Sequence, residues 1–377
     1  MRIGVVGTES GTDDGERRVA VTPDVATRLI GRGHQVEIAT RAGTGAGHTD
    51  DDYTAVGARI VDEETAWTAD LVATVGRPSL ATPVPRAVIG LLRPFDDPAG
   101  LAELASRGAI LFAFEAVPRT TRAQVVDALS SQATVLGYQG VLEAAARSDR
   151  LFPMLTTAAG TIRPSKVLVL GAGVAGLQAI ATARRLGASV SAFDVRAAAA
   201  EQVRSLGATF VEIDAPSQDA TASGGYAQAV GRDEQDRIIA GLAPHVAAAD
   251  VVITSAAIPG RRAPVMIDAA TLAGMRRGAV IVDLAASTGG NCAATEPGRT
   301  IQVEGVTVIG DLDLVGRVAR DASAMYARNV AAFVDLVTAD DGSFHTDWDD
   351  DIVAGSCVAR DGVVVHPLLT ARSTEAP

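Results

Sequence analysis

Residues 166–196 read KVLVLGAGVAGLQAIATARRLGASVSAFDVR, and this stretch limits the possible folds more than any other part of the sequence. Residues 166–170 have the aliphatic composition of a buried strand, and LQAIATARRLGA has the composition of a helix. Between them, Gly171, Gly173 and Gly176 have the spacing G-x-G-x-x-G. A strand, this glycine turn and a helix in that order predict a parallel α/β sheet whose first turn binds a dinucleotide.

Each residue of the turn has a separate expected task. Gly171 permits the tight turn, Gly173 lets the backbone approach the pyrophosphate, and Gly176 allows the helix to pack closely on the sheet. The helix N-terminus, which includes Val174 and Ala175, would present N–H groups and a positive dipole end to the phosphates.

The second strand of this unit, SVSAF, ends at Asp194. A carboxylate there is expected to accept hydrogen bonds from the adenosine ribose hydroxyls, and it would repel a 2′-phosphate. The sequence therefore predicts a preference for NAD(H) over NADP(H). Val195 and Arg196 follow and are expected at the same site, and the charge of Arg196 would soften this preference.

Strand-like and helical stretches alternate along most of the chain, which predicts α/β domains. Helical tracts at residues 121–148 and from about residue 322 bracket the second α/β segment, so we expect two crossings between domains. The expected fold is two Rossmann-like domains with parallel sheets, separated by a cleft that forms the active site and linked by these two long helices. The first domain would comprise residues 1–130 and 325–377, and the second, NAD(H)-binding domain residues 131–324.

Charge and hydropathy exclude several classes of function. The formal net charge of −12 disfavours nucleic acid and anionic membrane surfaces as partners. No run of about 18 apolar residues is present, so direct membrane insertion is not expected. The N-terminus lacks the pattern of a signal peptide, which favours a cytoplasmic protein. The five histidines show no metal-ligand spacing, so no metal site is expected.

Several motifs occur in an order that resembles one known family. They are KVLVLGAGVAGLQAIATARRLGA, AFDVR, GGYA, DVVITSAAIPGRRAP, VIVDLAASTGGNC and YARNV. Together they resemble the NAD(H)-binding α subunits (domain I) of proton-translocating NAD(P) transhydrogenases, in a wider family that includes alanine dehydrogenase. The resemblance covers about residues 1–370 and is densest over 118–330.

The resemblance implies a transhydrogenase, in which hydride passes directly between NADH and NADP⁺ while protons move elsewhere in the complex. It implies a homodimer whose partners are an NADP(H)-binding β subunit and membrane-spanning subunits. Through these partners the chain would lie peripherally at the inner face of the cell membrane.

The segment VPRTTRAQVVDALSSQ stands where this family carries its nicotinamide-site loop. The resemblance implies that Arg119, Asp127 and Ser130 hold the nicotinamide, chiefly through its carboxamide. Gln124 would face the second nucleotide on the partner. Two alternatives remain open: Gln124 completes a capping box with Thr121, and Ser130 only packs.

Other positions are expected near the cofactor. In the family, the loop that contains Tyr226 closes over the bound nucleotide, although an ordinary surface tyrosine is the alternative. Ala256, Asp283 and Asn291 follow strands and are expected beyond the carboxyl ends of the sheet. Asp283 could equally be a structural residue at a strand end.

The sequence departs from alanine dehydrogenases at their substrate site. Thr74 stands at the lysine position, GLLRPFDD has no histidine, and Ser287 stands at the aspartate position, so that only Arg18 remains. Reduction of an imine or keto acid needs a proton donor and a carboxylate clamp, so amino-acid dehydrogenation is not expected. Two alternatives stay open: a stand-alone reductase anchored by Arg18 and Arg77, and a non-catalytic NAD(H)-sensing protein. Val315, where the family has proline, is a further departure.

Overall fold

The computed structural model describes residues 1–7, 16–77, 84–214, 231–258 and 260–370. The chain divides into two compact units. Unit 1 comprises Met1–Gln132 and Val315–Pro377, and unit 2 comprises Ala133–Leu314. The chain crosses from unit 1 to unit 2 inside helix α5 (Ala128–Arg147) and returns directly after Leu314.

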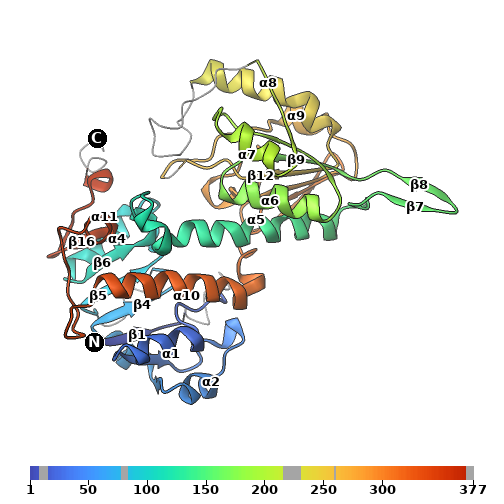
Figure 1. Ribbon diagram of the computed structural model, residues 1–377. Helices are drawn as coiled ribbons and strands as arrows, with labels where there is room; N and C mark the ends of the chain where they lie inside the picture. Colours follow the sequence, from blue (N-terminus) through green and yellow to red (C-terminus); the bar gives the residue numbers. More distant parts are fainter. Residues whose placement is uncertain (8–15, 78–83, 215–230, 259, 371–377) are drawn as a thin grey trace. The chain divides into compact units, whose positions relative to one another are not determined.

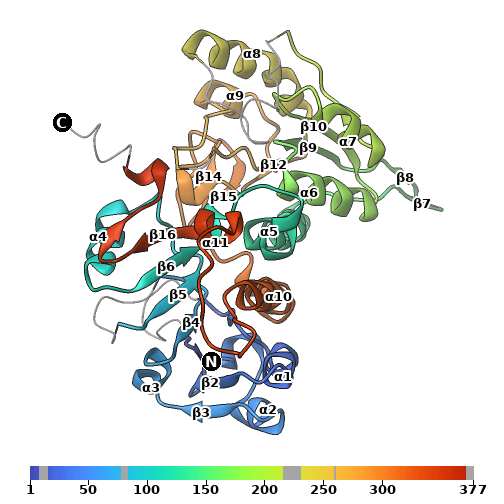
Figure 2. The ribbon, with the colours of Figure 1, turned by 60° about the vertical axis from the view of Figure 1, so that its left-hand side comes forward.

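Unit 1 is built on a sheet in the order β17-β16-β6-β5-β4-β1-β2-β3 (Figures 1 and 2). The strands from β6 to β3 in this order are parallel, whereas β16 and β17 add an antiparallel edge. The strands are β1 (Arg2–Val5), β2 (Gln35–Ala39), β3 (Arg59–Val61), β4 (Leu71–Ala73), β5 (Ala87–Gly90), β6 (Ile110–Ala113), β16 (Cys357–Arg360) and β17 (Val363–Val364). The α-helices are α1 (Pro23–Gly31), α2 (Asp50–Ala55), α3 (Glu63–Trp67), α4 (Pro98–Ser106), α10 (Ala319–Leu336) and α11 (Asp351–Ser356). The 3₁₀ helices are η1 (Thr44–Ala46), η2 (Phe114–Ala116), η3 (Arg122–Val126) and η6 (Gly316–Val318).

Helices cover both faces of the unit 1 sheet. Side chains of α1 and α10 pack on one face, and side chains of α3 and α4 pack on the other. Successive residues of a strand therefore enter different cores, as Ile89 and Val88 of β5 do. This explains why the strands read as aliphatic runs instead of alternating with polar residues. On the α10 side, the rings of Phe112 and Phe333 lie 5.0 Å apart between centroids.

Unit 2 has a sheet in the order β11-β10-β9-β12-β13-β15-β14, parallel except for β14. Its strands are β9 (Lys166–Leu170), β10 (Ser189–Phe193), β11 (Thr209–Phe210), β12 (Val251–Thr254), β13 (Val280–Asp283), β14 (Thr300–Val303) and β15 (Val306–Ile309). Its helices are α6 (Val174–Arg185), α7 (Ala199–Ser205), α8 (Arg232–Ala248), α9 (Ala269–Ala273) and the 3₁₀ helix η5 (Ala286–Thr288), besides most of α5.

The unit 2 sheet also lies between two cores. Val167 and Val169 of β9 pack with α6 and with the later part of α5, whereas Leu168 and Leu170 pack toward α8 and α9. A separate hairpin, β7 (Leu155–Thr157) and β8 (Gly160–Ile162), extends away from the rest of unit 2 (Figure 1). None of the helices in the described part of the chain is both long and apolar enough to cross a membrane.

Candidate cofactor-binding site

The glycine turn joins β9 to α6, as the sequence predicts. Gly171 has a φ of +96°, a left-handed conformation that glycine adopts without steric cost. A Cβ atom added at Gly176 would lie 1.8 Å from the carbonyl oxygen of Gly171, whereas one added at Gly173 would meet no atom within 4 Å. The fold itself therefore requires Gly171 and Gly176. Gly173 leaves open space at the start of α6, which is where a pyrophosphate would lie.

Helix α6 begins at Val174, and Gly173 is its N-cap without a side-chain hydrogen bond. The side chain of Val174 is 43% exposed. The backbone of Ala175 lies close to Gly137 of α5. A Cβ atom added at Gly137 would lie 2.1 Å from the Ala175 carbonyl oxygen. No side chain therefore caps this helix end, and Val174 and Ala175 lie at it. The turn thus fits the phosphates of a dinucleotide.

Asp194 directly follows β10 and is almost fully buried. Its Oδ2 accepts hydrogen bonds from Ala172 N at 2.7 Å and from the Arg196 guanidinium at 2.9 Å. Its Oδ1 accepts from Arg196 N and Nε, both at 2.9 Å. The bond to Asp194 raises the pKa of Arg196. Because a carboxylate has about four acceptor positions, a ribose hydroxyl would have to replace one of the Arg196 donors.

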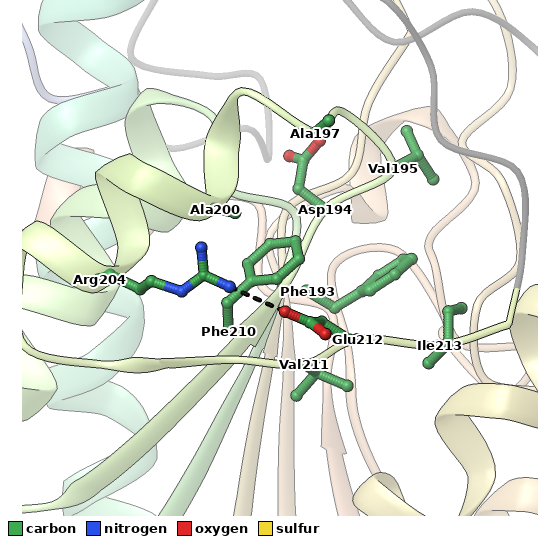
Figure 3. A pocket seen from close by; sticks show the side chains of 10 residues that line it. All are labelled: Phe193, Asp194, Val195, Ala197, Ala200, Arg204, Phe210, Val211, Glu212 and Ile213. Carbon is green, nitrogen blue, oxygen red and sulfur yellow. Dashed lines mark hydrogen bonds and ion pairs between the residues drawn. The ribbon is translucent and has the colours of Figure 1, made fainter.

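A pocket of about 410 Å³ lies at the ends of β10 and β11, and Figure 3 shows its lining. Asp194 and Val195 form part of the wall, together with the rings of Phe193 and Phe210. Arg204 and Glu212 form an ion pair of 2.8 Å in the same lining. A pocket of this volume is in the range of small-ligand sites. It lies directly beside the carboxylate that the sequence predicts as the ribose ligand.

Asp283 ends β13 and is completely buried. Protein groups donate hydrogen bonds to both of its carboxylate oxygens, namely Thr254 Oγ1, Ala285 N, Asn291 N, Cys292 N and Thr295 Oγ1. This geometry favours the structural alternative for Asp283.

Asn291 is buried as well, and its side chain bonds Ala256 N and O at 3.0 and 2.8 Å and Pro264 O at 2.8 Å. It therefore holds the loop after β12, in which Ala256 and Ser255 border the glycine turn.

Two further expectations concern the lid and metals. Tyr226 lies outside the described residues, so its role stays a prediction. Among the residues that the structure describes, no group of three or more His, Cys, Asp or Glu side chains could hold a metal ion.

The nicotinamide loop, which we define as residues 117–132, belongs to unit 1. The 3₁₀ helix η3 ends at Val126 and α5 begins at Ala128, so Asp127 lies between them. Asp127 Oδ1 accepts from Ser130 N at 2.9 Å, and Oδ2 accepts from Ser130 Oγ at 2.6 Å. Asp127 therefore caps α5 and fixes the Ser130 hydroxyl, so these two predicted residues lie together.

The prediction of a capping box and a helix from residue 121 is wrong in detail. Thr121 makes no side-chain capping bond, and Gln124 bonds Thr121 only through the backbone. The reason is that Asp127, with ψ of 82°, interrupts the helical path and supplies the cap itself. The side chains of Gln124 and Arg119 are exposed.

Arg122 anchors the nicotinamide loop to the C-terminal segment, which the sequence does not indicate. Its guanidinium donates to Asp350 Oδ2 at 2.7 Å and also bonds Asp351, at the start of α11. These bonds raise the pKa of Arg122 and lower that of Asp350. The side chain of Val125, three residues further on, is apolar and exposed.

Glu115 lies in η2, shortly before the nicotinamide loop, and the sequence does not single it out either. It accepts hydrogen bonds from Leu92 N at 3.2 Å and Arg93 N at 2.7 Å. Burial raises its pKa to about 7, although these backbone bonds act in the opposite direction. The local sequence FAFEAVP does not distinguish Glu115 from a surface residue, because its hydrogen-bond partners, Leu92 and Arg93, follow another strand, β5.

The positions that correspond to the alanine dehydrogenase substrate site are occupied by other interactions. Arg18 pairs with Glu16 at 2.5 Å and donates to Gln132 Oε1 at 2.8 Å. Arg77 pairs with Asp97 at 2.6 Å. Thr74 is buried and bonds Gly76 O, and Ser287 is exposed. Both arginines that could anchor a small acid are thus engaged by carboxylates of the chain.

The fold and the glycine turn define a dinucleotide-binding α/β protein with two sheets. Family models described as "Alanine dehydrogenase/PNT, N-terminal domain" and "Alanine dehydrogenase/PNT, C-terminal domain" match residues 6–136 and 140–367. The chain belongs to the alanine dehydrogenase/PNT family.

Within this family, the chain is more similar to transhydrogenases than to alanine dehydrogenases. It is 41% identical over 374 residues to the protein named as the first part of NAD(P) transhydrogenase subunit alpha in Rhodospirillum rubrum. The match covers 94% of this chain and 96% of that protein. A transhydrogenase structure from Sinorhizobium meliloti matches with a TM-score of 0.86 and 39% identity, covering 97% and 100% of the two chains. An L-alanine dehydrogenase structure matches with a TM-score of 0.81 but 26% identity, covering 100% and 99%.

Proposed function

We propose that this chain is the NAD(H)-binding α-type subunit of a proton-translocating NAD(P) transhydrogenase. Hydride passes directly between NAD(H) on this chain and NADP(H) on a partner subunit. The observation that carries the proposal is the combination of an intact dinucleotide turn with a lost acid–base site. Gly171, Gly173 and Gly176 fit a pyrophosphate, while Thr74 and Ser287 replace the ionisable residues and Glu16 engages Arg18.

The chemistry explains why such a combination is functional. When bound, the nicotinamide ring supplies a hydride donor or acceptor, and its exchange with a second nicotinamide requires no proton at the reacting carbons. The protein then needs only to hold its nicotinamide ring at the right distance from the second ring and to keep other hydride acceptors away. The stand-alone reductase gains no support, because Arg18 and Arg77 are both paired with carboxylates.

Within this proposal, the nicotinamide loop holds the ring. Arg119, Asp127 and Ser130 bind its carboxamide, and the ordered Asp127–Ser130 pair supports this role. Gln124 faces the partner's nucleotide, which its exposed side chain supports, as does the neighbouring Val125 at 64% exposure.

In unit 2, Asp194 selects NAD(H), because its buried carboxylate is a poor neighbour for a 2′-phosphate even with Arg196 beside it. Tyr226 belongs to a loop that covers the nucleotide. Asn291 keeps Ala256 beside the glycine turn, and Asp283 stabilises Asn291.

The proposal includes partners. Membrane-spanning subunits translocate the protons and hold this chain peripherally at the inner face of the membrane, and a β subunit binds NADP(H). The names of the relatives, which are subunits called alpha, support a multisubunit complex.

A homodimer is also part of the proposal. Met154, Leu155 and Ile162, at the hairpin β7–β8, are 64%, 44% and 48% exposed, so a second copy has apolar surface to cover. A two-stranded hairpin alone is marginally stable in water, which favours a covered state. Light scattering should give the mass of a dimer for the wild type and a smaller mass for Leu155→Lys.

The experiment mixes the purified chain with an NADP(H)-binding transhydrogenase subunit and follows NADPH-dependent reduction of an NAD analogue. The proposal predicts turnover that requires both proteins. Binding of NADH without hydride transfer, in the presence of a partner that is active with another α subunit, would contradict it.

A further inference from the structure

Helix α10 presents polar side chains at every third residue to three different segments of unit 1. Ser323 Oγ accepts a hydrogen bond from Val19 N at 3.0 Å, and Tyr326 donates its hydroxyl to Thr74 O at 2.7 Å. Asn329 is the third of this series, and it contacts the nicotinamide loop. Positions three apart lie on one face of a helix, so these contacts come from a single face of α10.

Asn329 bonds the nicotinamide loop at two points. Its Nδ2 donates to the carbonyl oxygen of Val125 at 2.9 Å, and its Oδ1 accepts from Ser131 Oγ at 2.8 Å. Val125 lies in η3 and Ser131 in α5, so the two bonds are on opposite sides of Asp127. Asn329 is only 7% exposed, and a buried amide makes both bonds because it is a donor and an acceptor at once.

The network continues beyond Ser131. Gln132 Nε2 donates to Ser131 Oγ at 3.2 Å and to Ala322 O of α10 at 3.2 Å. Gln132 Oε1 accepts from Arg18, which Glu16 holds in place. A continuous chain of hydrogen bonds therefore leads from Arg18 to Val125 through Asn329. Arg18, whose counterpart in alanine dehydrogenases binds substrate, here stabilises the base of the nicotinamide loop.

We propose that Asn329 is a positioning residue that sets the register of Asp127 and Ser130 by tying the nicotinamide loop to α10. The inference rests on the proposed function. The side chain of Val125 is exposed, while its neighbours Ala123 and Val126 are buried, so the Asn329 bond adds a directional contact at the Val125 carbonyl to the apolar packing of η3. Hydride transfer requires the reacting atoms at about 3–3.5 Å, and a displacement of about 1 Å can cost about 100-fold in rate.

The test is Asn329→Asp, which keeps the size of the side chain and the acceptor for Ser131 but places an oxygen against Val125 O. With an NADP(H)-binding subunit, we expect kcat to fall about 10- to 100-fold while the KM for NADH changes less than about threefold. Lowering the pH should restore part of the lost kcat relative to wild type, because the introduced carboxyl group, once protonated, donates to Val125 O as the amide does.

Tyr326→Phe is the matched control. It removes an equally buried hydrogen bond one turn earlier on the same helix, from Thr74 O, and should keep kcat within about twofold. Ser131→Ala removes the contact with Asn329 Oδ1 together with the Ser131 bonds to Ala128 O and from Gln132 Nε2, but it keeps the Asn329 bond to Val125 O. It covers the case in which Asn329→Asp does not fold. We expect it to lower kcat about threefold with an unchanged thermal midpoint. The proposal would be overturned if Asn329→Asp had the same kcat as Tyr326→Phe. If Asn329→Asp does not fold, the same comparison applies to Ser131→Ala and Tyr326→Phe.

Failure of the proposed function gives a different result. If wild type transfers no hydride to a competent partner, the emission of bound NADH reports the surroundings of the nicotinamide instead. A change of that emission in the Asn329→Asp or Ser131→Ala variant, at an affinity like that of Tyr326→Phe, supports the positioning role. Emission identical to that of Tyr326→Phe overturns it.

Discussion

The glycine turn of unit 2 and the nicotinamide loop of unit 1 are held in place in opposite ways. Most of the close contacts that shape the turn lie within residues 166–196, including Gly176 against Gly171 and Asp194 against Ala172, and Ser255 Oγ adds a bond to Gly171 O at 3.0 Å. The nicotinamide loop depends on Asn329 and Asp350, which lie about 200 residues further along the chain. The turn of unit 2 is therefore shaped mainly by nearby residues, whereas the loop of unit 1 is held by remote segments of the same unit.

The largest effect is expected at the glycine turn. Gly176→Ala places a Cβ atom against the backbone oxygen of Gly171, so we expect a loss of about 1–3 kcal/mol in the free energy of unfolding and no measurable NADH binding. Gly173→Ala is the matched control, since an added Cβ meets no atom there. It should unfold nearly like wild type yet bind NADH at least tenfold more weakly. Calorimetry and NADH fluorescence measure both. If Gly176→Ala were stable and bound NADH, the close approach of residue 176 to the Gly171 carbonyl oxygen would not be required for the turn.

At the nicotinamide loop, Asp127→Asn should lower hydride transfer about 100-fold, because the geometry of the reacting ring is disturbed. The free energy of unfolding should fall by no more than about 1 kcal/mol, the usual value of a helix cap. Asp62→Asn alters an equivalent cap, on α3, where Asp62 accepts from Thr65 N at 2.6 Å. If both variants transferred hydride equally well, Asp127 would be only a cap.

The pH dependence of the free energy of unfolding tests the environment of Glu115, which segments remote in the sequence of unit 1 create. The Glu115 pKa of about 7 lies above the value of about 4.3 in an unfolded chain, so the folded state binds more protons between these pH values. The free energy of unfolding therefore falls as pH rises, by about 2 kcal/mol from pH 5 to pH 7. Urea unfolding should show that Glu115→Gln removes this slope, while Glu103→Gln, at an exposed position of α4, keeps it. An unchanged slope in Glu115→Gln would assign the pH dependence to other groups.

Asp194→Asn tests how residues 166–196 of unit 2 set the preference between NADH and NADPH. We expect the Kd for NADH to rise about tenfold, because hydrogen bonds to a charged group contribute about 1.5–3 kcal/mol. The ratio of the Kd for NADPH to that for NADH should fall, since the charge that opposes a 2′-phosphate is gone. Fluorescence titration with each nucleotide measures this ratio. An unchanged ratio would show that Asp194 does not set the preference.

The smallest effect is expected for Arg122→Ala, which removes the exposed ion pairs with Asp350 and Asp351. Exposed pairs contribute little, so hydride transfer should fall less than about threefold. Arg299→Ala removes a comparable exposed pair with Glu296 in unit 2 and should have no effect. A tenfold loss in Arg122→Ala would mean that this anchor, and not Asn329, dominates the position of the loop.

The same contrast explains what the sequence could predict. Strand β9 and the glycine turn follow from period, composition and spacing, and they occur as expected. The break at Asp127 does not follow from the pattern, because a side-chain bond to Ser130 overrides the helical composition of residues 121–148. The contacts of Asn329 could not be read from sequence, since its partners Ser131 and Val125 are 198 and 204 residues away.

The central claim is that hydride passes directly from a nicotinamide on this chain to one on a partner. NADH deuterated at the transferred C4 position, incubated with the chain, the NADP(H)-binding subunit and NADP⁺, tests it most directly. The account predicts that all of the deuterium that leaves NADH appears at C4 of NADPH, with none released to water. Deuterium lost to solvent, or NADH bound without any deuterated NADPH in the presence of a competent subunit, would contradict it.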